Sequence, residues 1–167
     1  CAQWIRINFP STKIAMGGGY VNTELRSLSD PAIFNYTDYL LYDDGELPLF
    51  RLLTGGELIR TLYRNDEGEI VRVNFDSKEN VPFAETGTPS YDGLLQNNYL
   101  NLIELTNPMH ALWSNGRWNK MILAHGCYWG KCTFCDISLD YIKLYEPITA
   151  KILVDRMEEL IAQTGEN

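Results

Sequence analysis

Short apolar runs separated by turn-forming residues make up the first half of the chain. Residues 13–19 (KIAMGGG) predict a short buried strand that runs into a glycine turn, and residues 39–44 (YLLYDD) predict a second short strand. A turn at residues 44–46 then leads into residues 47–53, whose apolar positions fit a helix with proline in its first turn. A Gly-Gly pair ends that helix. The succession of strands and helix indicates an α/β layer.

A hairpin and a long irregular stretch are predicted next. Residues 61–64 and 69–75 are β-rich, and the Asn-Asp-Glu-Gly sequence between them has turn chemistry. Residues 76–119 then show little periodicity and hold three of the seven prolines. Because about forty residues without strong elements are too many for an ordinary loop, we expect a linker between two domains, with a short helix near Gln96–Leu100.

Regular periodicity returns at Lys120. Residues 121–124 (MILA) predict a continuous apolar strand of the parallel kind that is covered on both faces. Thr149 is a suitable N-cap for a helix that continues to about Gln163. We expect this helix to bury Leu153, Val154, Met157, Leu160 and Ile161 and to expose Asp155, Glu158 and Glu159. Strand, loop and helix in this order form the first unit of a repeating α/β barrel or layer, with the loop where such folds place their sites.

Charge and hydropathy exclude two classes of function. The net charge is −8 and no Lys/Arg cluster interrupts it, so the basic face that a nucleic-acid-binding module needs is missing. No apolar run approaches the roughly 18 residues of a membrane span, and residues 1–30 hold no secretory signal pattern. We therefore expect a cytoplasmic protein. The Cys start and the helix that ends near the last residues suggest a fragment of a longer polypeptide.

Three of the four cysteines lie within nine residues, at Cys127, Cys132 and Cys135, while Cys1 stands apart. Thiolates are the soft ligands that iron–sulfur clusters prefer, and closely spaced Cys are their usual trace in a sequence. Four thiolates would complete a four-iron cluster and leave it to carry electrons. Three would leave one iron without a protein ligand, free to bind a cofactor or substrate, as a catalytic zinc keeps an open position.

A strand that ends in a Cys loop, with an aromatic residue (Phe134) just before the last Cys, resembles the C-x3-C-x2-C signature of the radical S-adenosylmethionine superfamily. The resemblance implies a 4Fe–4S cluster on Cys127, Cys132 and Cys135 whose open iron binds S-adenosylmethionine, with Phe134 bordering the adenine. It implies an oxidoreductase that cleaves this cofactor reductively and abstracts a hydrogen atom from an unknown substrate. The expected partners are small molecules and an electron donor such as flavodoxin or ferredoxin. Later strands would supply the remaining contacts, so we expect this chain alone to be inactive.

The Cys spacing departs from that signature, because four residues instead of three separate Cys127 from Cys132. Gly130 lies in the longer arc and can absorb the extra residue by adopting a conformation closed to other residues. One alternative is a structural zinc site on the same cysteines, with His125 as a fourth ligand, in a binding or interaction module. Another is an electron-carrying iron–sulfur protein with a fourth protein ligand.

The first half resembles the last portion of a cobalamin-binding domain, on residues 13–53 and their KIAMGGGYVN and DDGE sequences. This resemblance implies that Gly17, Gly18 and Gly19 let the backbone approach the nucleotide tail of cobalamin. The cobalt-ligating pattern Asp-x-His-x-x-Gly is missing. The alternatives are the phosphate site of another nucleotide-binding α/β domain and a tight turn without a ligand. The predicted organisation is a partial Rossmann-like unit (1–56), a hairpin and linker (57–116) and the start of a radical S-adenosylmethionine barrel (117–167).

Overall fold

The computed structural model describes residues 1–27, 30–94 and 119–165. The predicted linker helix near Gln96–Leu100 lies outside these ranges. The chain divides into two compact units. Unit 1 contains residues 1–81 and 129–143, and unit 2 contains residues 82–128 and 144–167. Among the described residues, no helix has the length and apolar character needed to span a bilayer.

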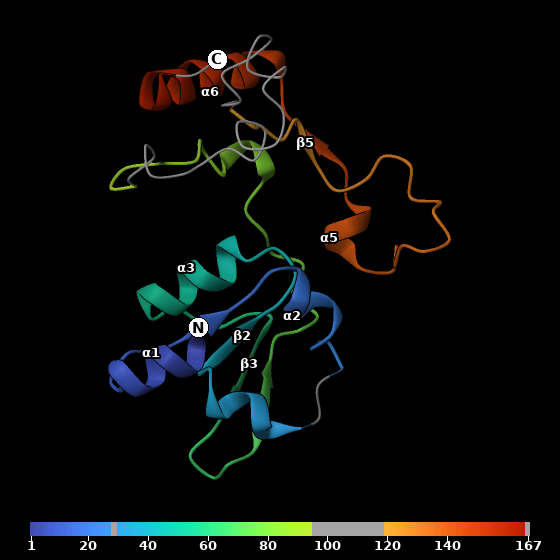
Figure 1. The fold of residues 1–167 in the computed structure, drawn as a ribbon. Coiled ribbons are helices and arrows are strands. Elements are labelled where there is room, and N and C mark those ends of the chain that lie inside the picture. The colour runs from blue at the N-terminus through green and yellow to red at the C-terminus, as the bar shows by residue number, and fades with distance from the viewer. Residues whose placement is uncertain (28–29, 95–118, 166–167) are drawn as a thin grey trace, which may run out of the picture. The chain divides into compact units, whose positions relative to one another are not determined.

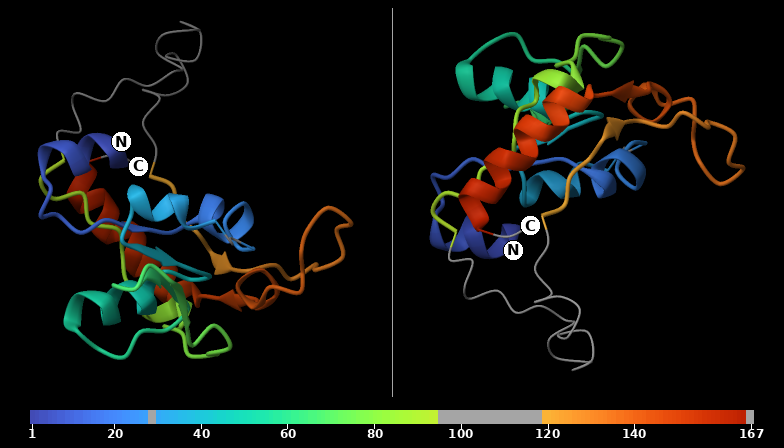
Figure 2. Two further views of the ribbon diagram at one scale, coloured as in Figure 1. Left: turned by 90° about the horizontal axis from the view of Figure 1, so that it is seen from below. Right: turned by 90° about the horizontal axis from the view of Figure 1, so that it is seen from above.

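Unit 1 is built on a four-stranded mixed sheet (Figure 1). Its strands follow the order β1-β2-β3-β4, in which β1 and β2 run parallel and the other neighbours run antiparallel. The strands are β1 (Ala15–Met16), β2 (Tyr39–Leu41), β3 (Thr61–Arg64) and β4 (Ile70–Val73). The helices are α1 (Ala2–Asn8), α2 (Gly19–Thr23), the 3-10 helix η1 (Pro31–Asn35), α3 (Glu46–Thr54) and α5 (Asp140–Lys143). Figure 2 shows α3 and η1 on opposite sides of the sheet.

The core of unit 1 lies between the sheet and the α2–η1 connection. Side chains alternate between the two faces of a strand, so Leu40 and Tyr42 point to the same face. They pack there with Leu62 of β3, Val21 of α2 and Phe34 of η1. The Tyr42 hydroxyl donates to the Leu25 carbonyl at 2.7 Å, which satisfies the one polar atom of a fully buried ring.

The amino end of β2 is held by Asp38. Its carboxylate accepts the backbone N–H of Ile14 at 2.8 Å and pairs with Arg6 at 3.0 Å and Lys13 at 3.1 Å. Burial raises the pKa of Asp38, but these hydrogen bonds lower it by more, so the pKa lies below its ordinary value. Asp38 thereby connects the residues that precede β1 to the start of β2.

The first-half predictions are largely confirmed. The hairpin pairs β3 with β4, and Gly68 in its turn has φ +86°. The helix after the acidic turn ends at Gly55, which has φ +70°. The predicted buried strand at 13–19 is shorter, however, because only two of its residues pair, and its buried side chain is Ile14. The helices α1, α2 and η1 were not predicted.

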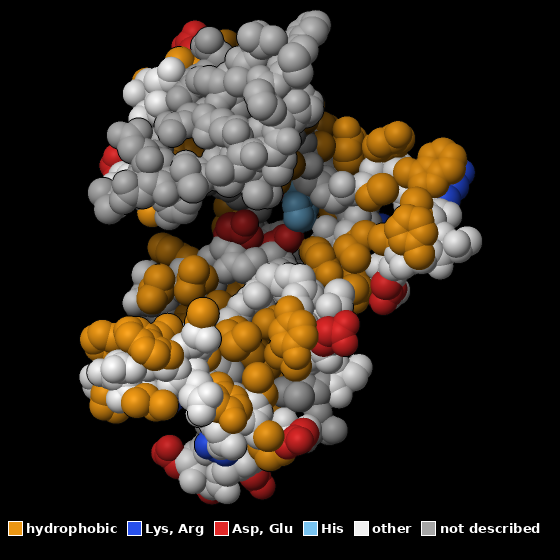
Figure 3. Space-filling view, viewed as in Figure 1, with side chains coloured by type: hydrophobic (Ala, Val, Ile, Leu, Met, Phe, Trp, Pro, Cys, Tyr) orange, Lys and Arg blue, Asp and Glu red, His pale blue; other side chains and the backbone are white. Residues whose placement is uncertain are grey.

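Helices α1 and α3 expose apolar side chains to solvent. Trp4 and Ile7 of α1 are 62% and 71% exposed, and Phe50 and Leu53 of α3 are 62% and 76% exposed. Figure 3 shows hydrophobic side chains gathered over both helices. Helix formation at residues 47–53 therefore does not depend on burying every apolar position of the segment.

Unit 2 joins a two-stranded ribbon to one long helix. Its elements are η2 (Phe83–Glu85), β5 (Ala124–His125), β6 (Glu146–Pro147) and α6 (Ala150–Thr164). Arg156 of α6 donates to the carbonyls of Phe83 and Ala84 at 3.1 and 3.0 Å, and its guanidinium lies 5.4 Å from the Phe83 ring centre. A buried arginine thus connects η2 to α6.

The strand predicted at residues 121–124 is wrong in part. The strand expected at residues 121–124 consists of Ala124 and His125 and pairs antiparallel with β6, while Ile122 and Leu123 are 66% and 58% exposed. Among the described residues β5 pairs only with β6, and Ile122 and Leu123 precede the strand and stay in solvent. On α6, Thr149 caps the helix as predicted by accepting the Ile152 N–H.

The predicted apolar stripe of α6 is only partly buried. Leu160 is fully buried, whereas Val154, Met157 and Ile161 are 50%, 44% and 39% exposed. The helix turns Arg156 toward η2 instead, because that side chain finds two carbonyl acceptors there. The acidic face is exposed as predicted, with Asp155, Glu158 and Glu159 in solvent.

Candidate functional site

The cysteine loop (residues 126–136) follows β5 directly. In the described chain Cys127, Cys132 and Cys135 are outside any disulfide and of intermediate exposure, and Cys1 is exposed. The Cys135 N–H donates to the Cys132 carbonyl at 3.3 Å, so the last two cysteines share one tight turn. The loop therefore carries three partly shielded cysteine side chains.

Gly130 in the longer arc of the loop has the conformation predicted for it. Gly130 has φ +57°, a left-handed conformation that glycine adopts without steric cost. After the last cysteine, Asp136 accepts the Ser138 N–H at 3.0 Å and its hydroxyl at 2.6 Å. The hydroxyl bond and the N–H bond lower the pKa of Asp136, and the chain turns here toward α5.

The three cysteines are divided between the two compact units. Cys127 belongs to unit 2, while Cys132 and Cys135 belong to unit 1. Among the described residues, no three His, Cys, Asp or Glu side chains gather into a group that could hold a metal ion. The donor chemistry fits a thiolate-bound cluster, and ligation would require the three thiols to converge.

Aromatic side chains of the loop face solvent. Phe134 is 91% exposed, Tyr128 is 80% exposed and Trp129 is 55% exposed. The Lys131 ammonium lies 5.5 Å from the Trp129 ring centre, a cation–π distance. Trp113 and Trp118, which also flank the loop in the sequence, lie outside the described residues. The adenine contact expected of Phe134 stays a prediction.

The glycine run and the acidic turn (Asp43–Glu46) lie at the carboxyl end of the parallel strands β1 and β2. Gly18 has φ +85° and precedes α2, and a Cβ on Gly17 would meet the Leu41 carbonyl oxygen at 3.4 Å. Open α/β sheets bind their ligands outside this edge. Gly18 therefore has a conformational reason to be glycine, whereas a Cβ would fit at Gly17 in ordinary contact and Gly19 has open space around it.

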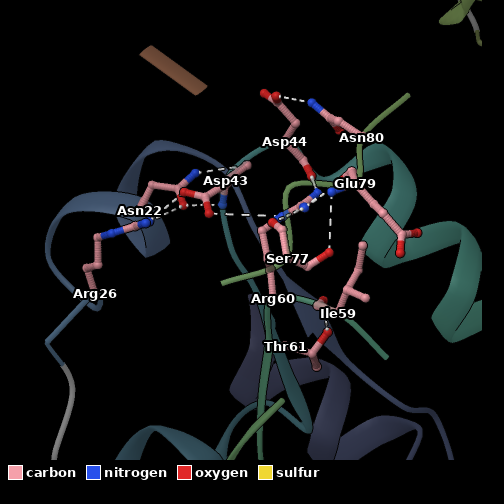
Figure 4. A network of polar contacts seen from close by, with 10 residues as sticks. All are labelled: Asn22, Arg26, Asp43, Asp44, Ile59, Arg60, Thr61, Ser77, Glu79 and Asn80. Atoms are coloured by element: carbon pink, nitrogen blue, oxygen red, sulfur yellow. Dashed lines mark hydrogen bonds and ion pairs between the residues drawn. The ribbon is translucent and has the colours of Figure 1, made fainter. Parts of the chain in front are cut away.

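Three charged or polar residues of unit 1 were missed by sequence reasoning. Arg26 forms an ion pair with Asp43 at 2.7 Å, and the Asn22 side chain bonds both the N–H and the carbonyl of Asp43. The buried Arg60 guanidinium donates to the Asp44 carbonyl at 3.4 Å (Figure 4). No spacing in the sequence marks these residues, because only the fold brings them to the acidic turn.

Comparisons with known proteins bear on the fold. No protein-family model matches the chain, and no curated protein matches it. The chain is similar to the solved structure of the apo, selenomethionine-labelled cobalamin-dependent S-adenosylmethionine radical enzyme OxsB, with a TM-score of 0.62 and 20% sequence identity. The match covers 98% of this chain and 21% of that chain, so the chain spans about a fifth of the OxsB length. At this identity the likeness shows the fold, and it confirms the predicted α/β class with a partial Rossmann-like unit.

Proposed function

We propose that this chain is part of a radical S-adenosylmethionine enzyme in which Cys127, Cys132 and Cys135 hold a 4Fe–4S cluster. The observation that carries the proposal is the cysteine loop itself: three cysteines within nine residues, directly after β5, with left-handed Gly130 in the longer arc. The similarity of the chain to a cobalamin-dependent radical enzyme supports it.

The residues of this chain would supply ligands and shielding. Cys127, Cys132 and Cys135 would hold the cluster through their thiolates, and the iron without a protein ligand would be open to S-adenosylmethionine. When bound, the reduced cluster supplies the electron that cleaves this cofactor reductively and starts radical chemistry on an unknown substrate. Phe134 would cover the adenine and thereby lose much of its present exposure.

The same proposal includes a place for cobalamin in the parent protein. Gly17, Gly18 and Gly19 stand at the carboxyl edge of β1, where close backbone approach to a ligand is sterically open at Gly19. An external electron donor such as flavodoxin or ferredoxin would reduce the cluster. The proposed parts of the chain are the partial Rossmann-like unit (1–56), the hairpin and linker (57–116) and the start of the barrel (117–167).

The test is anaerobic reconstitution of the 167-residue chain with iron and sulfide. We expect about four iron and four labile sulfide per chain. Each of Cys127→Ser, Cys132→Ser and Cys135→Ser should lower both contents strongly. Cys1→Ser is the matched control, because this exposed thiol lies outside the cysteine loop, and it should leave both contents unchanged.

A second measurement tests the open iron. Adding S-adenosylmethionine to the reduced cluster should change its electron paramagnetic resonance spectrum. An unchanged spectrum would favour an electron-carrying cluster with a fourth protein ligand. One zinc per chain without labile sulfide would replace the proposal with a structural zinc site in a binding module.

A further inference from the structure

The short helix η2 is bound to three other elements of unit 2. From α6, the Arg156 guanidinium donates to the carbonyls of Phe83 and Ala84 at 3.1 and 3.0 Å. From β6, the Glu146 carboxylate accepts the Phe83 N–H at 3.2 Å. From β5, the His125 ring lies 5.9 Å from the Phe83 ring between centres, with 38° between the ring planes. Phe83 therefore joins the three elements through its carbonyl, its N–H and its ring.

The contact with α6 involves a buried charge. Arg156 is 7% exposed, and its guanidinium also lies 5.4 Å from the centre of the Phe83 ring. Loss of its carbonyl acceptors would leave a buried charge poorly compensated, which is costly. Figure 2 shows η2, in yellow-green, beside α6, in red. Because α6 is a helix of 15 residues, η2 rests on an extended regular element.

The ribbon of β5 and β6 leads directly to the first clustered cysteine. His125 and Glu146 form its last residue pair, and Cys127 follows two residues after His125. Residues opposite each other in an antiparallel pair are close neighbours. Phe83 contacts both members of this pair, His125 through its ring and Glu146 through its N–H. One residue of η2 thus holds both strands at the point where the cysteine loop begins.

Contacts between the two chain segments continue on the other side of Cys127. The Tyr128 and Tyr145 rings lie 6.0 Å apart between centres and meet edge to face, at 68°, an arrangement that aromatic rings favour. Before Cys127, Gly126 lies against the backbone of Leu144. Cys127 is therefore flanked on both sides by contacts with the segment that returns to β6.

Cys132 and Cys135 are held in a different way. Both belong to unit 1, and they share a turn that is closed by the hydrogen bond from the Cys135 N–H to the Cys132 carbonyl. The position of Cys127 in unit 2 thus has a structural basis of its own. A change in η2 should reach Cys127 and leave the other two cysteines as they are.

We propose that η2 is the support that positions Cys127 in unit 2, with Phe83 as the positioning residue. Phe83 acts through His125 and Glu146, which it contacts directly. The ribbon needs such a support because it consists of two residue pairs, and a two-stranded ribbon is marginally stable by itself. The consequence for the proposed function is that Cys127 stands in place before a cluster binds. That consequence rests on the proposed function, whereas the support of the ribbon does not.

The test is the rate at which iodoacetamide alkylates Cys127 in the whole chain without metal, compared between the parent and Phe83→Ala. Trypsin cleaves after Lys131 and so separates Cys127 from Cys132 and Cys135, which lets mass spectrometry follow the two peptides individually. We expect alkylation of Cys127 to become about fivefold faster, because the ribbon opens more often. Alkylation of Cys132 and Cys135 should stay unchanged. No acceleration at Cys127, or equal acceleration at all three cysteines, would overturn the inference.

Two further variants separate support of Cys127 from a general loosening of unit 2. Phe83→Tyr keeps the ring and the backbone N–H and should restore the parent rate. Tyr91→Ala is the matched control, since Tyr91 is also a half-buried aromatic residue of unit 2. It joins α6 through its N–H, which donates to the Gln163 side chain at 3.0 Å and which the substitution keeps. Acceleration at Cys127 as large in Tyr91→Ala as in Phe83→Ala would contradict the specific role of η2.

A second pair of variants keeps the test valid if Phe83→Ala does not fold. Glu146→Ala removes the acceptor of the Phe83 N–H, whereas Glu146→Gln keeps a carbonyl oxygen for it. Alkylation of Cys127 should be about twofold faster in Glu146→Ala and close to the parent rate in Glu146→Gln. Equal rates in the two variants would again overturn the inference. Failure of cluster assembly in the unsubstituted chain would count against the proposed function and leave the alkylation result intact.

Discussion

Gly126 lies directly against the backbone of Leu144. A Cβ built on Gly126 would stand 1.5 Å from the Leu144 carbonyl oxygen, and Gly126 has φ +73°. The contact brings together the two ends of the segment that contains all three clustered cysteines. One end lies just before Cys127, and the other lies just before β6. Glycine is required here for two independent reasons, its conformation and the space available.

We predict that Gly126→Ala destabilises the protein by about 3 kcal/mol or more, because the backbone of Leu144 must move and the left-handed conformation becomes unfavourable. The midpoint of denaturation by guanidinium chloride measures the loss. Gly45→Ala is the control: Gly45 has φ −79° and open space around its Cβ position. Equal effects of the two substitutions would contradict the close approach at Gly126.

Asp38 should make stability depend on acidic pH. Its pKa in the folded protein lies below the ordinary value of 3.8, because hydrogen bonds outweigh burial. Its contribution is therefore fully present above pH 3.8 and is lost as the pH falls through the lower folded-state pKa. Asp38→Asn should remove about 1 kcal/mol at neutral pH and remove that part of the acid dependence. Urea denaturation between neutral and strongly acidic pH checks this, and parallel pH profiles for the two proteins would contradict it.

Tyr42→Phe should cost about 1–3 kcal/mol, because the buried carbonyl of Leu25 loses its hydroxyl donor. The ring itself keeps its packing in the core, so the fold should survive. Thermal unfolding followed by circular dichroism measures the change. Tyr20→Phe serves as the comparison, since Tyr20 is 59% exposed, and it should stay within about 0.5 kcal/mol of the parent.

Arg156→Met should detach η2 from α6. Two carbonyls, of Phe83 and Ala84, lose their shared donor, and we expect a loss of about 2 kcal/mol. Faster amide exchange in residues 83–86 would locate the effect. Lys151→Met on the same helix removes an exposed ion pair with Asp155 and should leave the stability nearly unchanged, because solvent screens this pair. Unaltered exchange at residues 83–86 in Arg156→Met would show that the arginine is not the connection.

Local features of the sequence predicted local structure well. Thr149 caps its helix, Gly55 ends α3, and the Asn-Asp-Glu-Gly sequence turns the hairpin. Each of these depends on residues within one turn of each other, where the preferred backbone conformation and the hydrogen-bonding group are both readable. The left-handed conformation of Gly130 was predicted on a different ground, the extra residue between Cys127 and Cys132.

Burial and pairing were less predictable. The apolar residues 121–124 indicate a covered strand, yet in the described chain only β6 pairs with β5, and Ile122 and Leu123 face solvent. Periodicity records which residues are apolar and not which partner covers them. Arg156 shows the converse, a charged residue that is buried because two carbonyl groups of η2 receive its hydrogen bonds.

The sequence by itself determined the chemistry of the candidate site, since three closely spaced thiols have the character of soft metal ligands wherever the chain places them. It also determined the α/β order of elements. Only the tertiary structure decided what surrounds that chemistry: Arg60 and Arg26 reach the acidic turn from distant parts of the chain, and Leu144 returns to Gly126. The physical reason is that capping and turn formation are local, whereas close packing and ion pairing depend on contacts between residues far apart in the sequence.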